Sequence, residues 1–332
     1  MIKSVFVMNQ GSFPLVYTDD VREYLYQHSN LVAPPMSNEE LQENVSILQE
    51  VEVIFSGWGG PKIDQSLLET APHLKAVFYA AGSLKTIATE AAWERGITFT
   101  SAYAANAIPV AEYTLSQILF SLKNGWKYVH EIKEKKVYPS KPLQDISGAF
   151  GTTVGIISLS TVGRRVCELL KMFDVNVIAY DPFAQKRDEK DLNVTLVSLE
   201  EIFERADIVS LHAPWLAETE GMITGTHFQK MKRNASFINT SRGRIVREEE
   251  MLEVLRERKD VTAILDVTDP EPPEEGADIF SFSNVILTPH LAGSEERECG
   301  RMGAYMLEEF YRYVEGEPLK WQVTREKFQI QA

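Results

Sequence analysis

Residues 154–163, VGIISLSTVG, place an apolar strand directly before the start of a helix. A turn of this kind binds the pyrophosphate of a dinucleotide when it reads G-x-G-x-x-G. Here Ser158 and Ser160 occupy the first two glycine positions, and Gly163 keeps the third, which permits close packing of helix on strand. Because an ordinary strand-to-helix turn accounts for this degenerate motif equally well, the motif alone is weak evidence.

The two serines are expected to weaken cofactor binding without abolishing it. A residue other than glycine in a sparsely allowed backbone region costs about 1 to 3 kcal/mol, or roughly ten- to a hundredfold in affinity. In compensation, the Ser160 hydroxyl can donate a hydrogen bond to a phosphate oxygen. The free amides of Thr161 and Val162 also begin a helix whose positive end attracts an anion.

The strand that follows supports a dinucleotide site. It ends in Asp181, eighteen positions after Gly163, where an acidic residue can bind the adenosine ribose hydroxyls. A carboxylate at this position repels a 2′-phosphate, so the sequence favours NAD over NADP. The alternative is an aspartate that only caps a turn at the strand end.

Apolar runs alternate with helix-length segments along the whole chain, which predicts parallel sheets covered by helices. An apolar helix expected over 108–123, with Asn106 as its N-cap, is interpreted as the crossing between two lobes. The segment 124–150 is lysine-rich and irregular, either a partner contact or a solvated face. The candidate strands are 4–8, 51–57, 74–80 and 96–102, and then 153–159, 176–182, 206–214, 235–243, 262–272 and 284–293.

Polar residues follow the strands of the second series. In an open parallel sheet, ligands bind beyond the carboxyl ends of the strands. Each of these residues alone is more typical of a cap or a surface charge, but together they predict one shared crevice. They are Asp181, His212, Arg242, Asp266 with Glu271, and His290.

Composition restricts the classes of partner. The chain of 332 residues carries 34 Lys and Arg against 48 Asp and Glu, a net charge of −14, which disfavours nucleic acid. Cys167 and Cys299 are too few for a disulfide framework or a structural zinc site, so we expect a reducing cytoplasm and no metal. The amino terminus resembles a first strand rather than a secretory signal or membrane span, so no membrane partner is expected.

Three blocks carry a family resemblance. NTSRGRIVREEEMLEVL (239–255), AILDVTDPEPP (263–273) and NVILTPHLAGS (284–294) resemble a signature of the D-isomer-specific 2-hydroxyacid dehydrogenases, and the similarity extends from about Val51 to Leu319. The resemblance implies two doubly wound α/β lobes with the active site in the cleft. A Rossmann cofactor domain would span 104–296, and a flavodoxin-like substrate domain would combine 1–103 with 297–332. It also implies a homodimer with an arm near 121–150.

The resemblance also implies an NAD-dependent reaction on a small 2-hydroxy or 2-keto acid. Arg242 would bind the substrate carboxylate, and His290, assisted by Glu271, would be the acid and base. Gly82, Ser83 and Trp58 would contact substrate, although Trp58, like Trp215, is also interpretable as a core residue. The expected cofactor contacts are Ser160, Thr161, Val162, Asp181, Pro182, His212, Ala213, Pro214, Thr219, Thr240, Ser241, Arg242, Asp266, His290 and Gly293.

The chemistry of these side chains suits hydride transfer. The planar guanidinium of Arg242 can hydrogen-bond a carboxylate and a carbonyl oxygen together. An imidazole exchanges protons near neutrality. Without the family context, His290 is more typical of a structural residue, Arg242 of a helix entry and Glu271 of a solvated loop. An NAD(H)-sensing corepressor of the same fold, or a protein that holds a small acid without turnover, are the alternatives.

Overall fold

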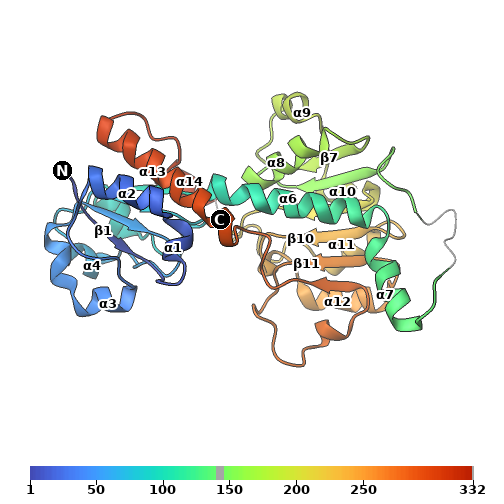
Figure 1. Ribbon diagram of the computed structural model, residues 1–332. Helices are drawn as coiled ribbons and strands as arrows, with labels where there is room; N and C mark the ends of the chain where they lie inside the picture. Colours follow the sequence, from blue (N-terminus) through green and yellow to red (C-terminus); the bar gives the residue numbers. More distant parts are fainter. Residues whose placement is uncertain (140–145, 331–332) are drawn as a thin grey trace. The chain divides into compact units, whose positions relative to one another are not determined.

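The computed structural model describes residues 1–139 and 146–330. They form two compact units, Met1–Ala107 with the segment from Ser294 onward, and Ile108–Gly293. The expected domain boundaries, 103/104 and 296/297, lie a few residues from these divisions. Each unit contains one sheet with helices on both faces (Figure 1). Residues 140–145 of the expected arm, and the last two residues, lie outside the described residues.

The second unit is built on a seven-stranded sheet with every pairing parallel. Its spatial order is β12-β11-β10-β9-β6-β7-β8. The order reverses between β6 and β9, as in the doubly wound Rossmann sheet, which confirms the predicted fold class. The strands are β6 Thr153–Ile157, β7 Asn176–Tyr180, β8 Thr195–Leu196, β9 Ile208–Leu211, β10 Ser236–Asn239, β11 Thr262–Leu265 and β12 Val285–Leu287.

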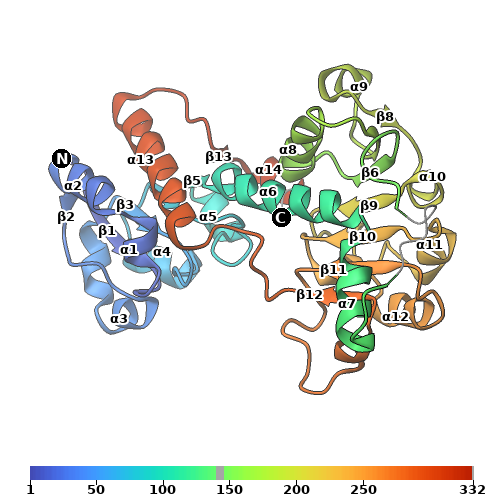
Figure 2. The same cartoon turned by 45° about the vertical axis from the view of Figure 1, so that its right-hand side comes forward.

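Alternating strand residues supply two cores in this unit, one on each face of the sheet. Ile156 packs on the face covered by α6, α8 and α9, whereas Ile157 packs on the face covered by α10, α11 and α12. Figure 2 shows β9, β10 and β11 side by side within this sheet. The helices are α6 Tyr103–Ser121, α8 Thr161–Leu170, α9 Lys186–Leu192, α10 Leu199–Arg205, α11 Gly225–Lys230 and α12 Glu248–Glu257.

The first unit has a six-stranded sheet with the order β13-β5-β4-β3-β1-β2. Strands β1 to β5 are parallel and follow the flavodoxin-like order 2-1-3-4-5. The edge strand β13 pairs antiparallel with β5, a departure from the expected all-parallel sheet. The strands are β1 Lys3–Val7, β2 Asn30–Leu31, β3 Val53–Ser56, β4 Ala76–Tyr79, β5 Thr98–Ser101 and β13 Gln322–Val323.

Helices also cover both faces of this sheet. Phe6, Phe55 and Phe310 belong to the core beneath α1, α2 and α13, while Ile54 belongs to the core beneath α3, α4 and α5. The helices are α1 Phe13–Val16, α2 Asp19–His28, α3 Asn38–Glu43, α4 Gln65–Thr70, α5 Glu90–Glu94, α13 Cys299–Glu315 and α14 Arg325–Ile330. Short 3-10 turns are η1 Val45–Glu50, η2 Gly243–Ile245, η3 Asp278–Ser281 and η4 Glu296–Glu298.

The long helix α6 begins earlier than predicted. It starts at Tyr103, directly after β5, so Asn106 lies inside the helix and the prediction of an Asn106 cap was wrong. The Asn106 side chain instead accepts a hydrogen bond from the Ser294 amide at 2.9 Å. The alanine-rich start of this segment favours a helix. The helix continues through Pro109, which removes one backbone hydrogen-bond donor.

Part of the segment expected to be irregular is a helix, α7, over Gly125–Lys135. Trp126, Val129 and Ile132 recur at helical spacing, a pattern that the surrounding charges obscure. Trp126 donates to the Gln117 side chain on α6 at 3.0 Å and packs edge-on against the Phe120 ring. These contacts hold one face of α7 against α6.

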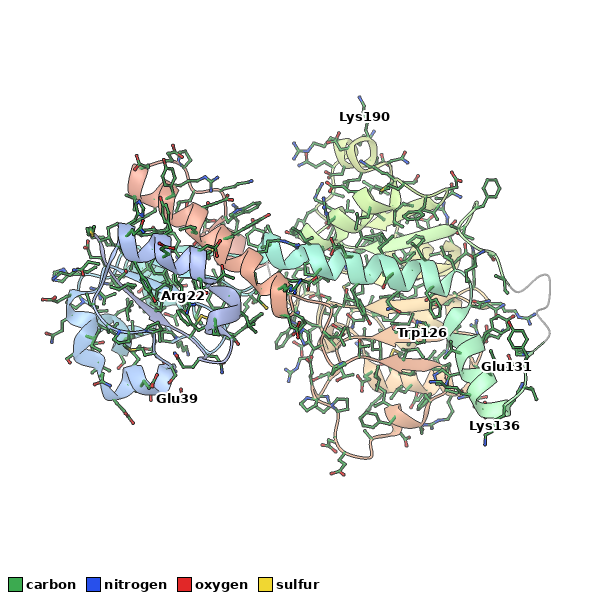
Figure 3. The ribbon with its side chains drawn as sticks, viewed as in Figure 1. Arg22, Glu39, Trp126, Glu131, Lys136 and Lys190 are labelled. Carbon is green, nitrogen blue, oxygen red and sulfur yellow. The ribbon has the colours of Figure 1, made fainter. Side chains whose placement is uncertain are left out.

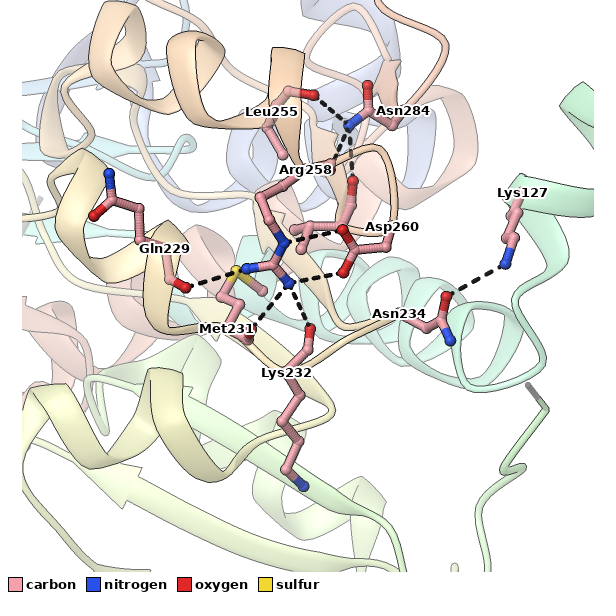
Figure 4. A network of polar contacts seen from close by, with 10 residues as sticks. Lys127, Gln229, Met231, Lys232, Asn234, Leu255, Arg258, Asp260 and Asn284 are labelled. Atoms are coloured by element: carbon pink, nitrogen blue, oxygen red, sulfur yellow. Dashed lines mark hydrogen bonds and ion pairs between the residues drawn. The ribbon is translucent and has the colours of Figure 1, made fainter. Parts of the chain in front are cut away.

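A polar network fastens the amino ends of β10, β11 and β12 (Figure 4). Arg258 donates to both carboxylate oxygens of Asp260, at 2.9 and 2.7 Å, and to the carbonyl oxygens of Gln229 and Met231, each at 3.1 Å. The Asn284 amide donates to three carbonyl oxygens in the same region. This network lies at the edge opposite to the strand ends where ligands bind in such sheets, so its contribution is to stability.

Candidate active site

The turn between β6 and α8 has the backbone conformation that its motif normally assigns to glycine. Ser158 has a φ of 76°, in the left-handed region that disfavours residues with a Cβ atom. The first fingerprint position therefore keeps its tight turn although glycine is absent. The conformational cost of holding a residue other than glycine in this region, expected from the sequence, therefore falls on Ser158.

Gly163 is required by packing. A Cβ atom on Gly163 would lie 2.0 Å from the carbonyl oxygen of Ser158 and 3.5 Å from the Cβ of His212. Because no Cβ fits at the shorter distance, helix α8 can approach the turn only with glycine here. Close packing of helix on strand therefore still requires glycine at the third fingerprint position.

The Ser160 hydroxyl is used differently from the prediction. It is the N-cap of α8, where Oγ accepts from the Gly163 amide at 3.4 Å and donates to the His212 carbonyl oxygen at 2.9 Å. Its single proton is therefore directed to the end of β9 and not toward a phosphate. Helix α8 begins at Thr161, and the amides of Thr161 and Val162 have no partner within the helix.

Asp181, at the end of β7, is both a turn cap and a brace for the β6–α8 turn. Its Oδ2 accepts from the Leu159 amide at 2.7 Å and from the Ser158 hydroxyl at 3.2 Å. Its Oδ1 accepts from the Phe183 amide at 2.7 Å. Since the two oxygens of a carboxylate offer about four acceptor positions, one remains, on Oδ1. The neighbouring Pro182 is exposed.

The loop after β9 forms a continuous, hydrogen-bonded wall. His212 is buried beside the Ser210 hydroxyl, 2.9 Å from its Nε2, and burial lowers the pKa of this imidazole to about 3. The ring is therefore neutral at physiological pH. Thr219 donates to the Pro214 carbonyl oxygen at 2.6 Å, and the Ser241 hydroxyl donates to the carbonyl oxygen of Ala213.

Arg242 follows β10 and is half-buried. Burial lowers the pKa of its guanidinium, and the nearby Glu271 carboxylate opposes that shift, so the group stays charged at physiological pH. The Asn239 amide donates to the Arg242 carbonyl oxygen at 3.1 Å and fixes the backbone there. Next to it, Thr240 lies 3.3 Å from the Thr114 hydroxyl of α6. A charged, half-buried guanidinium can hold a carboxylate through two parallel hydrogen bonds.

His290 and Glu271 form the expected pair. The imidazole Nδ1 is hydrogen-bonded to Glu271 Oε1, and the two side chains are 48% and 37% exposed. The carboxylate fixes the orientation of the ring through Nδ1. His290 has a φ of 53°, so the loop that carries it makes a sharp turn.

Asp266 holds the His290 loop in place. This buried carboxylate accepts from the Leu291 and Ala292 amides, each at 2.9 Å, and from the Thr288 hydroxyl at 2.6 Å. The structure thus places Asp266 beneath the loop, on partners that the sequence did not predict. Tyr113, whose hydroxyl lies 2.9 Å from that of Thr288, was also missed, and no local pattern distinguishes it from a core residue of α6.

The remaining predicted residues lie elsewhere. Gly82, Ser83 and Trp58 belong to the first unit, where the Ser101 hydroxyl donates to the Gly82 carbonyl oxygen at 2.5 Å. Trp58 is 36% exposed and Trp215 is 40% exposed, so neither is the core residue that the sequence allowed. Gly293 ends the second unit.

Residues 1–139 and 146–330 contain neither a candidate metal site nor a candidate membrane-spanning helix. Within these ranges, no three His, Cys, Asp or Glu side chains come together in a way that suits a metal ion. None of the helices there has both the length and the apolar character that a bilayer crossing demands.

Both the sequence and the fold of this chain are similar to those of known proteins. Residues 115–292 match the family model of the D-isomer specific 2-hydroxyacid dehydrogenase, NAD binding domain. The chain is 30% identical over 275 residues to a hydroxypyruvate reductase of Thermotoga maritima, covering 82% of this chain and 88% of that protein. It is 32% identical over 287 residues to the D-3-phosphoglycerate dehydrogenase of Methanocaldococcus jannaschii.

That second match covers 86% of this chain and 53% of the archaeal protein, so the chain spans about half the length of that relative. The fold is similar to a crystal structure of an NAD-complexed D-isomer specific 2-hydroxyacid dehydrogenase from Lactobacillus delbrueckii ssp. bulgaricus. The TM-score is 0.79 at 20% identity, with 97% of this chain and 100% of that chain covered. This likeness supports the two-sheet architecture.

Proposed function

The chain belongs to the D-isomer-specific 2-hydroxyacid dehydrogenase family, and from this premise we propose that it interconverts a small 2-hydroxy acid and its 2-keto acid with NAD. The observation that carries the proposal is the pairing of His290 with Glu271, whose carboxylate is also close enough to interact with the charge of the half-buried Arg242. All three follow strands of the Rossmann sheet at its carboxyl edge, where ligands bind in such folds. They come from three separate loops, which an accidental cluster does not explain.

In this proposal Arg242 binds the substrate. Its planar fork donates to the carboxylate and to the oxygen on C2, and it stabilises the negative charge that develops on that oxygen during reduction. His290 moves the proton. Protonated at Nε2, it donates to the C2 oxygen in reduction, and neutral, it accepts the hydroxyl proton in oxidation. Glu271 orients the ring and stabilises its charged form.

Gly82, Ser83 and Trp58 remain proposed substrate contacts. The proposed cofactor contacts include Ser160, Thr161, Val162, Asp181, Pro182, His212, Ala213, Pro214, Thr219, Thr240, Ser241, Arg242, Asp266, His290 and Gly293. Among these, Ser160 contributes through its backbone and its cap, since its hydroxyl donates to His212.

The residues present fit a dinucleotide. Gly163 allows the close approach of α8 that the fingerprint needs, and the first amides of α8 are available to a phosphate. NAD, when bound, supplies or accepts the hydride at C2. Asp181 favours NAD over NADP, because a carboxylate repels a 2′-phosphate. Its remaining acceptor position on Oδ1 is the one proposed for a ribose hydroxyl.

The test is an NADH titration followed by a reductase assay. Fluorescence measures the binding of NADH and NADPH, and the loss of absorbance of NADH measures turnover with glyoxylate, hydroxypyruvate, pyruvate and bulkier 2-keto acids. We expect tighter binding of NADH than of NADPH and turnover of at least one acid. Binding without turnover of any acid would favour a sensor, and absence of binding would contradict the cofactor assignment.

We also propose a homodimer formed through the second unit. Figure 3 shows Trp126 and Glu131 on α7 and Lys136 just after it; no residue of α7 is fully buried. Large apolar side chains are exposed on α7 or within five residues of its ends: Phe120, Ile132, Val137 and Tyr138. Exposed apolar surface of this kind marks protein interfaces. Sedimentation should give a dimer for the wild type and a monomer for Ile132→Asp; a monomeric wild type would contradict the proposal.

A further inference from the structure

Arg244 lies where three loops of the second unit meet. Its guanidinium stacks over the Trp215 ring at 5.0 Å, in the loop after β9. Its Nε donates to Asp269 Oδ1 at 3.2 Å, in the loop after β11. Its own carbonyl oxygen accepts from the Gly221 amide at 2.9 Å. Arg244 itself follows β10, so one residue connects the exits of three neighbouring strands.

Asp269 is held from a second side by Glu248, at the start of α12. Glu248 Oε2 accepts from the Asp269 amide at 3.1 Å, and burial raises the pKa of this carboxyl. Gly243 completes the contact, since a Cβ there would lie 2.1 Å from the backbone of Thr268. The segment that contains Arg242 therefore packs closely against the backbone of the loop that contains Glu271.

This contact is close to Glu271, the proposed partner of His290. Asp269 precedes Glu271 by two residues, and the Thr268 hydroxyl donates to the Pro270 carbonyl oxygen at 2.8 Å, which stiffens the intervening chain. A displacement of Asp269 would move Glu271 relative to His290, and the pair depends on hydrogen-bond distance.

We propose that Arg244 is a positioning residue that, by bridging Trp215 and Asp269, sets the place of Glu271 against His290. This inference rests on the proposed function, because it assigns Arg244 a part in the proton transfer. Arginine suits the task, since its flat guanidinium stacks on an indole while its Nε donates in the plane. Lysine offers a point charge without the stacked plane.

The test compares Arg244→Ala with Arg256→Ala, a matched control. Arg256 also pairs with an aspartate, Asp278, at 2.9 Å, and lies over a ring, Phe282, at 5.4 Å. It is 55% exposed against 52% for Arg244. Each change is made in the wild type and in Glu271→Gln, and kcat, KM and thermal unfolding are measured. Arg244→Lys serves as a second variant if Arg244→Ala does not fold.

We expect Arg244→Ala to lower kcat about fivefold, as for loss of a partly exposed ion pair, with KM for NADH within about twofold. The effect should vanish in the Glu271→Gln background, because the group it positions is then already impaired. Arg256→Ala should leave kcat unchanged in both backgrounds. An unchanged kcat in Arg244→Ala, or an equal loss in both backgrounds, would overturn the inference.

Hydrogen exchange separates this inference from the proposed function. If the wild type turns over no acid, the proposed function fails. Hydrogen exchange of the Thr268, Asp269 and Glu271 amides then decides the inference. Faster exchange in Arg244→Ala than in Arg256→Ala and wild type supports it, because the Asp269 amide then loses its Glu248 acceptor more often. Equal exchange in all three proteins would overturn it.

Discussion

Gly163 packs so closely on Ser158 that a Cβ atom on Gly163 would lie 2.0 Å from the Ser158 carbonyl oxygen. Any larger residue at 163 would therefore have to open the turn between β6 and α8. Ser158 in turn holds a positive φ and a hydrogen bond to Asp181. The turn is therefore defined by packing at one end and by a strained, braced serine at the other. Four predictions follow from the described geometry of the second unit.

Gly163→Ala should damage both folding and cofactor binding. The new methyl group forces the backbone apart, which typically costs about 1 to 3 kcal/mol. Urea unfolding should report this loss, and NADH affinity should fall at least about tenfold, since the displaced helix carries the phosphate amides. Gly11→Ala is the control, because its Cβ would only meet a side-chain oxygen at 3.2 Å. Unchanged binding of NADH would contradict the assignment of this turn.

Ser158→Gly and Ser158→Ala should separate backbone strain from the hydroxyl. Both variants lose the hydrogen bond to Asp181, and only glycine relieves the positive φ. We expect Ser158→Gly to be more stable than Ser158→Ala by about 1 kcal/mol and to bind NADH more tightly than Ser158→Ala. Chemical denaturation and fluorescence titration measure the two differences. Equal values for both variants would mean that the left-handed conformation carries no cost.

His212 should make the protein less stable in mild acid. Its pKa is lowered from 6.5 to about 3 in the folded state, so between these values the unfolded chain binds the proton that the folded chain excludes. Stability therefore falls as the pH falls below 6.5, by about 1.4 kcal/mol for each pH unit. His212→Gln should remove about 1 kcal/mol of the loss of urea-unfolding stability between pH 6.5 and 5.5, where the unfolded histidine is only part-way through its titration. An identical slope in the variant would contradict the prediction.

His290→Ala should remove the proton donor and leave the cofactor in place. We expect turnover to fall by about a hundredfold or more, with the dissociation constant of NADH within about twofold of the wild type. His73→Ala, an exposed histidine of the first unit, is the control. Stopped-flow reduction of the best 2-keto acid measures the rate. Equal rates in wild type and His290→Ala would exclude this histidine from the mechanism.

The fold was largely predictable because its strands carry strong local patterns. Successive residues of β1 alternate between two cores, Val5 and Val7 in one and Phe6 in the other, as a strand buried on both faces requires. The two-residue strands β2, β8 and β13 have no such pattern and depend on neighbours distant in sequence. Helix α6 was mispredicted at its start because Asn106 was interpreted as an N-cap, whereas the helix already begins at Tyr103.

For the candidate site, the sequence indicated which residues follow the strand ends, but not most of their hydrogen-bond partners. The strand-end rule identified Arg242, Glu271 and His290, because each follows a strand of one parallel sheet. Hydrogen-bond partners were not predictable, since the Ser160 hydroxyl meets a carbonyl oxygen 52 residues away and Asp266 meets amides 25 and 26 residues away. Such pairs depend on how the loops meet, which a single sequence does not encode locally.

If Asp181 excludes the phosphorylated dinucleotide, as proposed, its three hydrogen bonds have a practical consequence for converting this chain to that cofactor. Exchanging the aspartate alone for a small neutral residue would remove the repulsive charge and, in the same step, unfasten Leu159 and Ser158 from the end of β7. Successful redesign must therefore supply a new anchor for those two groups, and libraries that vary the three positions jointly should outperform those that vary the acid by itself.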